Sequence, residues 1–480
     1  MNESSGFFQD LREHGSIRTF NRFLTTPVYI LGVLFLVMLA NDAAVELQVY
    51  TALLGIGCYI CLFADDLLPL MPILTGCYIS VSAQNNPGLN AQSVFTTQGV
   101  YILVLIVPFV ACLVFRLCTD KVFGGKAFFT KKRRLLPGMV LLGIAYVLGG
   151  LFSAAYPGLW KKSVLFGLLQ FAAVFLPYYI FSGAVNWKNA PKDYFPWIGF
   201  LTGLMLLFQI LRVYFHRDVI VEGVIIRDRI YSGWGMYNNI GSYLAMMIPF
   251  AFYLASRYNK GWLGSVVGSA FLLGVFFTCS RGAILVGSAV YLLCFVLLMI
   301  SAKNKKANRV TVTIFLSVLA LTVALFHKEI YLLFRSVLDR GFDPNNRNFI
   351  YEAGWKQFLQ YPVFGGSFYP VDFVPYDFSV VDSFSAFLPP RWHNTVIQLI
   401  ACTGVVGLCA YGYHRYQTVR MLFFRDRTRE KAFIACSVAV LLGTSLLDCH
   451  FFNIGPTLFY STGLAFAEFC VKPNEKDPIL

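Results

Sequence analysis

Long uninterrupted stretches of apolar residues dominate the sequence. They include residues 29–40, 100–115, 195–211 and 283–300. A stretch of about 18–20 apolar residues matches the hydrocarbon core of a bilayer, and a backbone inside lipid satisfies its hydrogen bonds internally as a helix. The stretches are apolar on all sides, whereas the helices of a soluble protein carry a polar face. The pattern therefore predicts an all-α, polytopic integral membrane protein.

The stretches predict about 14 transmembrane helices, within a range of 12 to 14. They form a single transmembrane domain over residues 27–470, between a polar tail of residues 1–26 and a tail of residues 471–480. The segment 67–81 is short and is interrupted by two prolines. The predicted spans are residues 27–41, 46–63, 67–81, 98–118, 135–153, 163–183, 195–211, 238–255, 262–278, 282–301, 310–327, 394–413, 431–447 and 452–470.

The composition agrees with this pattern. Of the 480 residues, 57% are hydrophobic and 13% are charged, whereas soluble domains carry about 25% charged residues. The polar first 26 residues lack the features of a cleavable signal peptide, and the first apolar stretch reads as an uncleaved anchor. Phosphate-binding loops, zinc-ligand spacings and nucleic-acid modules are absent from the sequence. We therefore expect membrane lipids, and no nucleic acid, among the partners.

The distribution of Lys and Arg orients the chain. If both termini are cytoplasmic, 26 of the 39 Lys and Arg residues lie in cytoplasmic tails and connections. This bias agrees with the positive-inside rule. Eleven others lie on the outer side, in two connections and at the start of one span. They are Arg212, Arg217, Arg227 and Arg229 in 212–237, Arg281, and Lys328, Arg335, Arg340, Arg347, Lys356 and Arg391 in 328–393.

Two explanations of the outer basic residues are open. Long outer loops tolerate charge without a function. Alternatively, the arginines form an anion site, most simply for phosphate, because guanidinium groups bind phosphate oxygens through several donors. The large extracytoplasmic loop 328–393 also contains a predicted interfacial helix over residues 348–361, rich in aromatic residues. Residues 362–390 are predicted to form a folded-over loop or lid.

Three groups of residues converge on the outer face. The first is Ser280-Arg281-Gly282, at the mouth of an apolar helix, where a charged residue indicates function or an interfacial anchor. The second is Arg340 and Arg347 with Trp355, followed by Pro362-Val363-Phe364-Gly365. The third is His393-Asn394, followed after nine residues by Gly404-Val405-Val406-Gly407.

These motifs resemble the O-antigen ligase and O-antigen polymerase superfamily of bacterial membrane glycosyltransferases. The resemblance covers about residues 230–415 and includes Asn238-Asn239, which follow Gly233-Trp234-Gly235. It implies transfer of a glycan from an undecaprenyl (polyprenyl) diphosphate carrier to a sugar hydroxyl or a lipid-linked acceptor. The reaction would take place at the outer face of the bacterial cytoplasmic membrane, with no metal or cofactor. The family usually has about twelve spans, fewer than the fourteen predicted here.

The chemistry assigns roles to individual residues. Arg281 and Arg347 would stabilise the departing diphosphate, and His393 would act as general base, unless it forms a structural hydrogen bond at a helix start. Asp448 and His450, in the turn between the last two spans, are competing bases. Predicted substrate-binding residues are Arg340, Arg229, Asn394, Arg391 and Arg227, and residues that could bind sugar hydroxyls are His216, Asp218, Glu222 and Asp228.

Other functions compete with this reading. A transporter or flippase of lipid-linked glycans would place charged residues at mid-bilayer depth, but here they are predicted at the outer surface. A non-catalytic membrane subunit would leave the His393 motif unexplained. Within the superfamily, two separate basic outer loops favour a polymerase, whose donor and acceptor both carry diphosphate, over a ligase. Alternatively, both loops flank a single diphosphate.

Overall fold

The computed structural model describes residues 14–43, 45–76, 99–119, 133–152, 157–216, 219–222, 224–232, 235–301, 305–338, 347–368, 391–425 and 428–470. Nearly all regular elements in these ranges are helices. They are α2 (Gly15–Leu24), α3 (Pro27–Ala43), α4 (Glu46–Phe63), α5 (Leu70–Gly76), α7 (Gly99–Thr119), α9 (Leu136–Leu151), η3 (Pro157–Leu159), α10 (Trp160–Ala184), α11 (Tyr194–His216), η4 (Arg227–Arg229), α12 (Tyr237–Arg257), α13 (Gly261–Phe277), α14 (Arg281–Ser301), α15 (Lys305–Leu325), α16 (His327–Leu338), α17 (Arg347–Gln360), α18 (Thr395–Phe423), α19 (Arg429–Ser445), η5 (His450–Phe452) and α20 (Ile454–Phe469).

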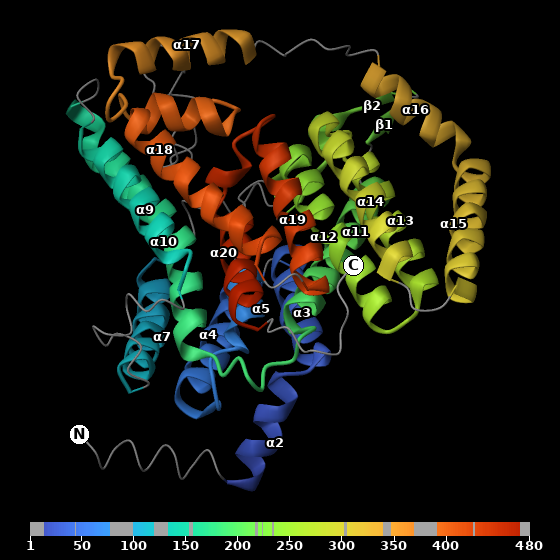
Figure 1. Cartoon of the computed structure of the whole chain (residues 1–480), viewed down its shortest axis with the longest axis horizontal. Coiled ribbons are helices and arrows are strands. Elements are labelled where there is room, and N and C mark those ends of the chain that lie inside the picture. The colour runs from blue at the N-terminus through green and yellow to red at the C-terminus, as the bar shows by residue number, and fades with distance from the viewer. Residues whose placement is uncertain are drawn as a thin grey trace.

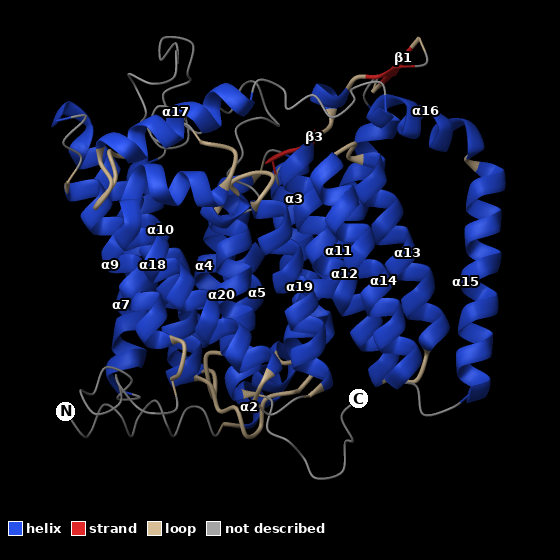
Figure 2. Cartoon of the chain, turned by 45° about the horizontal axis from the view of Figure 1, so that its top comes forward, coloured by secondary structure: helices blue, strands red, loops and turns tan. Residues whose placement is uncertain are grey.

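The helices form a bundle with α17 across one end and α2 at the opposite end (Figures 1 and 2). Helix α12 lies at the centre, packed against α11, α13, α14 and α19, and nearly all of its apolar stretch is buried. Helices α9, α10, α18 and α20 pack together on another side of the bundle. The bundle therefore places the starts of α12, α14 and α18 near the end that carries α17.

Five of the described helices are long and apolar enough to cross a membrane, namely α10, α11, α12, α14 and α18. The bent pair α2 and α3 would make a sixth, and five further apolar helices are shorter. The predicted all-α architecture with apolar spans is confirmed, while the number of fourteen spans stays a prediction. In the predicted span 67–81, α5 covers only Leu70–Gly76, about 10 Å of helix, and residues 77–98 lie outside the described ranges.

Helix α18 differs most from its predicted span. The prediction ended the span at residue 413 and placed Arg415 in a cytoplasmic connection, but the helix continues to Phe423. Gly404, with φ of 62°, breaks it into two segments. Hydropathy does not detect a backbone break, so the predicted span 394–413 includes the whole first segment of α18. Arg415 therefore lies in the second, continuing segment of α18, and its cytoplasmic position stays a prediction.

The two outer connections have their own secondary structure. The helix predicted over 348–361 is confirmed as α17, whereas most of the predicted lid, residues 369–390, lies outside the described ranges. Two antiparallel hairpins precede α12 and were not predicted. They are β1 (Ile220–Val221) with β2 (Val224–Ile225), in which Ile220 pairs with Ile225, and β3 (Tyr231–Ser232) with β4 (Gly235–Met236), in which Tyr231 pairs with Met236.

Candidate functional site

The glycine motifs of the second and third groups pack directly against each other. The Val405 N–H donates to the Pro362 carbonyl (2.9 Å), and the Gly366 N–H donates to the Ala401 carbonyl (2.8 Å). A Cβ atom on Gly404 would lie 2.3 Å from the Val363 carbonyl oxygen, so only glycine permits this approach. The contact fixes the end of α17 on the break in α18. Arg347 and His393, at the starts of these two helices, therefore lie at one end of the bundle.

Asn394 holds the start of α18. Its Oδ1 accepts hydrogen bonds from the Val396 and Ile397 N–H groups (2.8 and 3.1 Å), as an N-cap side chain does. Its Nδ2 donates to the Leu446 carbonyl at the end of α19 (2.8 Å). The geometry thus gives Asn394 a part in joining α18 to the turn after α19, while its predicted contact with substrate stays a prediction.

His393 occupies a strained position immediately before this cap. Its backbone φ is 51°, a conformation that is unfavourable for a residue with a side chain and persists only where its surroundings hold it. The Tyr351 hydroxyl on α17 donates to the His393 carbonyl (3.1 Å). Helix α17 and the Asn394 cap therefore hold the His393 backbone from both sides.

An open cavity lies between the starts of α12, α14 and α17 and the turn after α19. Three arginines line it. Arg281 begins α14, Arg347 begins α17, and Arg227 lies in η4 with its guanidinium 4.2 Å from the centre of the Tyr237 ring. The cavity is therefore lined by positively charged side chains from three segments that are far apart in the sequence.

Asp448 connects this cavity to His393. Its Oδ1 lies 3.1 Å from His393 Nδ1, and its Oδ2 lies 3.4 Å from Asn238 Nδ2 and 3.9 Å from an Arg347 guanidinium nitrogen. The Cys449 N–H also donates to Oδ1 (2.7 Å). Burial raises the pKa of Asp448, but the hydrogen bonds from His393 and the Cys449 N–H, and attraction to His450 and His393 in their protonated forms, outweigh it and hold the pKa below its usual range. Asp448 is therefore a carboxylate at neutral pH.

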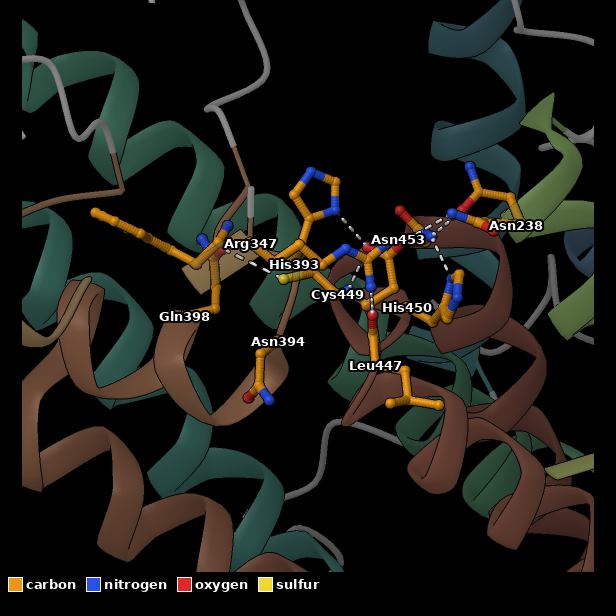
Figure 3. A network of polar contacts seen from close by, with 12 residues as sticks. Asn238, Arg347, His393, Asn394, Gln398, Leu447, Cys449, His450 and Asn453 are labelled. Carbon is orange, nitrogen blue, oxygen red and sulfur yellow. Dashed lines mark hydrogen bonds and ion pairs between the residues drawn. The ribbon is translucent and has the colours of Figure 1, made fainter. Parts of the chain in front are cut away.

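The Asp448 carboxylate fixes the tautomer of His393. A carboxylate only accepts hydrogen bonds, so the hydrogen of the neutral imidazole lies on Nδ1. Nε2 then carries the lone pair, on the side of the ring opposite the contact with Asp448 (Figure 3). The His393 side chain is 37% exposed. The contact leaves the Asp448 anion beside the ring, where it can stabilise the imidazolium form.

His450 lies deeper, at the floor of the cavity. Its Nε2 is 2.9 Å from Ser242 Oγ on α12, and its Nδ1 is 3.3 Å from Asn453 Nδ2. Burial lowers the pKa of His450, Asp448 raises it, and Arg391, Arg347 and His393 lower it further, with a net decrease. His450 is therefore a neutral, hydrogen-bonded residue and Asp448 is in contact with His393, while the choice of catalytic base among the three stays a prediction.

The structure gathers some of the predicted residues and not others. Arg281, Arg347 and Arg227 line the cavity, His393 contacts it through Asp448, and the charge of Arg391 acts on His450. Arg229, His216 and Glu222 are exposed and are not among the cavity-lining residues. Arg340 and Asp218 lie outside the described residues, as does the side chain of Asp228.

Two residues of the site were not predicted. They are Ser242, one helical turn after Asn238, and Asn453, which follows η5. Serine in an apolar stretch and asparagine at a helix start are both common, so neither gave a signal. In the described part of the chain, no group of three or more His, Cys, Asp or Glu side chains is arranged to hold a metal ion.

Comparison with known families bears on this site directly. Residues 266–412 match the O-antigen ligase family. The match covers less than a third of the chain, and it includes Arg281, Arg347 and His393 but neither Arg227 nor Asp448. It confirms the resemblance predicted from the motifs. Proteins with curated functions give no match to the chain.

Proposed function

We propose, taking the O-antigen ligase domain at residues 266–412 as the premise, that the protein is a polyprenyl-diphosphate-dependent glycosyltransferase. It would transfer a glycan from an undecaprenyl diphosphate carrier to a sugar hydroxyl at the outer face of the bacterial cytoplasmic membrane. The observation that supports this most is the Asp448–His393 pair beside a cavity lined by Arg227, Arg281 and Arg347. It brings a base next to an anion-binding surface.

The arginines act on the leaving group. When the bond between the anomeric carbon and the phosphate oxygen breaks, the electron pair stays on the diphosphate. Arg281 and Arg347 stabilise this charge through preorganised donors, and their planar guanidinium groups match phosphate oxygens in pairs. Arg227 adds a third positive charge to the lining of the cavity. The positive charge that stabilises the departing diphosphate therefore comes from side chains of the protein itself.

His393 acts on the acceptor. The acceptor oxygen forms the new bond to the anomeric carbon, and its proton passes to His393 Nε2. Asp448 accepts from Nδ1 throughout and stabilises the imidazolium that forms. The Arg347 guanidinium 3.9 Å from Asp448 balances the carboxylate charge beside the diphosphate. In this scheme His393 is the catalytic base and Asp448 is a positioning residue.

The cavity also bears on the choice between polymerase and ligase. A polymerase is favoured if the loops 212–237 and 328–393 bind two separate anionic substrates. Arg227 from the first loop and Arg347 from the second instead line one cavity. A single shared cavity favours one diphosphate site, and so a ligase-type transfer to a different acceptor.

Arg415 bears on the transporter alternative, because it is a charged residue within the apolar helix α18. Its guanidinium is enclosed by the rings of Tyr411, Phe451 and Tyr460, 4.1–5.0 Å from their centres. Such an enclosure is a packing arrangement rather than an ion pathway. A transporter also gives no role to a carboxylate-held histidine at the cavity edge, so the transferase remains our proposal.

The test is a reconstituted transfer reaction. Purified protein is given one lipid-linked oligosaccharide, first alone and then with a core-type glycolipid acceptor, and the products are separated by gel and mass. We expect transfer only when the acceptor is present. A ladder of longer lipid-linked products without acceptor would instead establish a polymerase, and no product in either reaction would contradict glycosyl transfer.

The proposed location at the outer face has a separate test. An impermeant thiol reagent should label Val224→Cys, which lies in the exposed hairpin near the α17 end, in intact spheroplasts. Tyr258→Cys is exposed in the turn between α12 and α13 and should stay unlabelled until the membrane is opened. The reverse pattern would place the cavity on the cytoplasmic side.

A further inference from the structure

The floor of the cavity carries a polar network that the proposed reaction does not use. Ser242 lies on α12 one turn after Asn238 and lines the cavity, and only 3% of its surface is exposed. His450 from η5 is equally buried and contacts the Ser242 hydroxyl. Burying polar groups costs desolvation energy, and here the two side chains offset part of that cost by bonding to each other at the wall of the cavity.

Asn453 determines which His450 nitrogen carries the hydrogen. Asn453 Nδ2 lies 3.1 Å from Asn239 Oδ1 and 3.3 Å from His450 Nδ1. An amide nitrogen only donates, so His450 Nδ1 accepts. The hydrogen of the neutral ring then lies on Nε2, which donates to Ser242 Oγ (2.9 Å). The hydroxyl hydrogen of Ser242 is therefore directed away from His450 and is available to an acceptor in the cavity.

The charges around the floor maintain this arrangement. Burial, Arg391, Arg347 and His393 all lower the pKa of His450, against the opposing effect of Asp448. A neutral imidazole is thus favoured, and protonation would place two donors, His450 Nδ1–H and Asn453 Nδ2, face to face. The same positive surroundings attract an anionic ligand group and give no advantage to a neutral sugar hydroxyl.

We propose that Ser242 donates a hydrogen bond to a phosphoryl oxygen of the lipid-linked diphosphate, and that His450 and Asn453 orient its hydroxyl. This inference rests on the proposed function. Arg227, Arg281 and Arg347 bind the charge of the diphosphate, and Ser242 adds a directed neutral donor at the floor. Ser242 is then a binding residue, and His450 is a positioning residue that acts through it.

The experiment measures binding of undecaprenyl diphosphate without glycan to the purified full chain. Ser242→Ala and His450→Ala should each weaken the Kd about 10-fold, the usual effect of one lost hydrogen bond to a charged group. The double variant should be no weaker than either single variant, because both remove the same bond. His450→Gln keeps an amide N–H near Nε2 and should recover most of the affinity. Ser256→Ala, at the far end of α12, is the matched control.

Each contrary result has a distinct meaning. An unchanged Kd in Ser242→Ala overturns the proposal. Weakening that appears only with a glycan-bearing donor would assign the hydroxyl to the sugar instead, and additive losses in the double variant would remove His450 from its positioning role. If the wild type binds undecaprenyl diphosphate but transfers no glycan under any condition, the proposed function fails while the assignment of Ser242 stands.

Discussion

Two arginines of this protein, Arg347 and Arg415, show how the same side chain is used in two ways. Arg347 lines the open cavity, donates to the Leu447 carbonyl and lies 3.9 Å from the Asp448 carboxylate. Arg415 lies inside α18, donates to the Tyr460 hydroxyl (2.7 Å) and is surrounded by aromatic rings. Its Nε and second terminal nitrogen are buried without a hydrogen-bond partner in the described part of the chain.

The difference between the two sites is access. A guanidinium beside an open cavity can exchange its water for phosphate oxygens, and a nearby carboxylate holds it in place. A guanidinium enclosed by rings is stabilised by cation–π attraction. Charge in a membrane protein therefore indicates function most clearly where it lines a cavity together with polar partners. Variants at the two sites should separate these roles.

The largest expected effect is at His393. His393→Ala should lower turnover by about 10²–10⁴-fold, the usual contribution of positioned proton transfer, because no other described base lies at this position. Binding of the lipid-linked donor should stay close to that of the wild type. Turnover and donor affinity are measured on the same preparation, and equal losses in both would reassign His393 to donor binding.

Arg281 comes next. Arg281→Lys keeps the charge but loses the planar pair of donors, so we expect turnover to fall by about 10²-fold, as on removing one donor to a developing oxyanion. Arg257→Lys, exposed at the other end of α12, serves as the control. Near-normal turnover of Arg281→Lys would reduce Arg281 to an interfacial anchor.

The pH dependence of stability should show the buried His450. Its pKa in the folded protein is lowered from 6.5, so below about pH 6.5 the unfolded chain binds a proton that the native chain excludes. Stability should therefore fall as the pH drops from 7.5 to 5.5. The titratable and charged groups that face His450 are Asp448, Arg391, Arg347 and His393. They are present both in the wild type and in His450→Gln, so the comparison isolates His450. The variant should show a flatter Tm profile, and identical profiles would contradict a buried neutral His450.

The smallest effect is expected at Arg415. Arg415→Met replaces a charge that has no carboxylate partner among the described residues with an apolar side chain of similar length, a change that is often neutral or stabilising. Tyr460 keeps its contacts with His414 (2.9 Å) and Thr418 (3.2 Å). Turnover should stay within about threefold of wild type, whereas Arg347→Met should lose most activity. Similar losses in both variants would erase the distinction between the two arginines.

Much of the site could be predicted because its chemistry is carried by rare residues. Arg281 interrupts an apolar stretch, and His393 is one of six histidines in the chain. The pairing of His393 with Asp448 could not be predicted, because the two residues are 55 positions apart and are brought together by tertiary contacts such as those of Asn394 with Leu446 and of Arg347 with Leu447. Ser242 could not be predicted either, because its role depends on the tautomer of His450.

The fold was predictable in kind but not in detail. Hydropathy identifies apolar helices, but it does not register backbone breaks such as Gly404, whose role depends on the contact with Pro362-Val363. Helix α18 therefore continues ten residues beyond the predicted span, to Phe423, and includes Arg415. The glycines of the motifs form a backbone contact that sets the positions of α17 and α18.

The most direct test of the central claim is the stoichiometry of the reaction. Purified wild type, in lipid, is given a glycan-bearing undecaprenyl diphosphate and an acceptor, and glycan transferred and free undecaprenyl diphosphate are measured together over time. We predict one carrier diphosphate released per glycan transferred, and release of neither product above background by His393→Ala. Carrier released without glycan transfer, or glycan transferred at the wild-type rate by His393→Ala, would contradict the account.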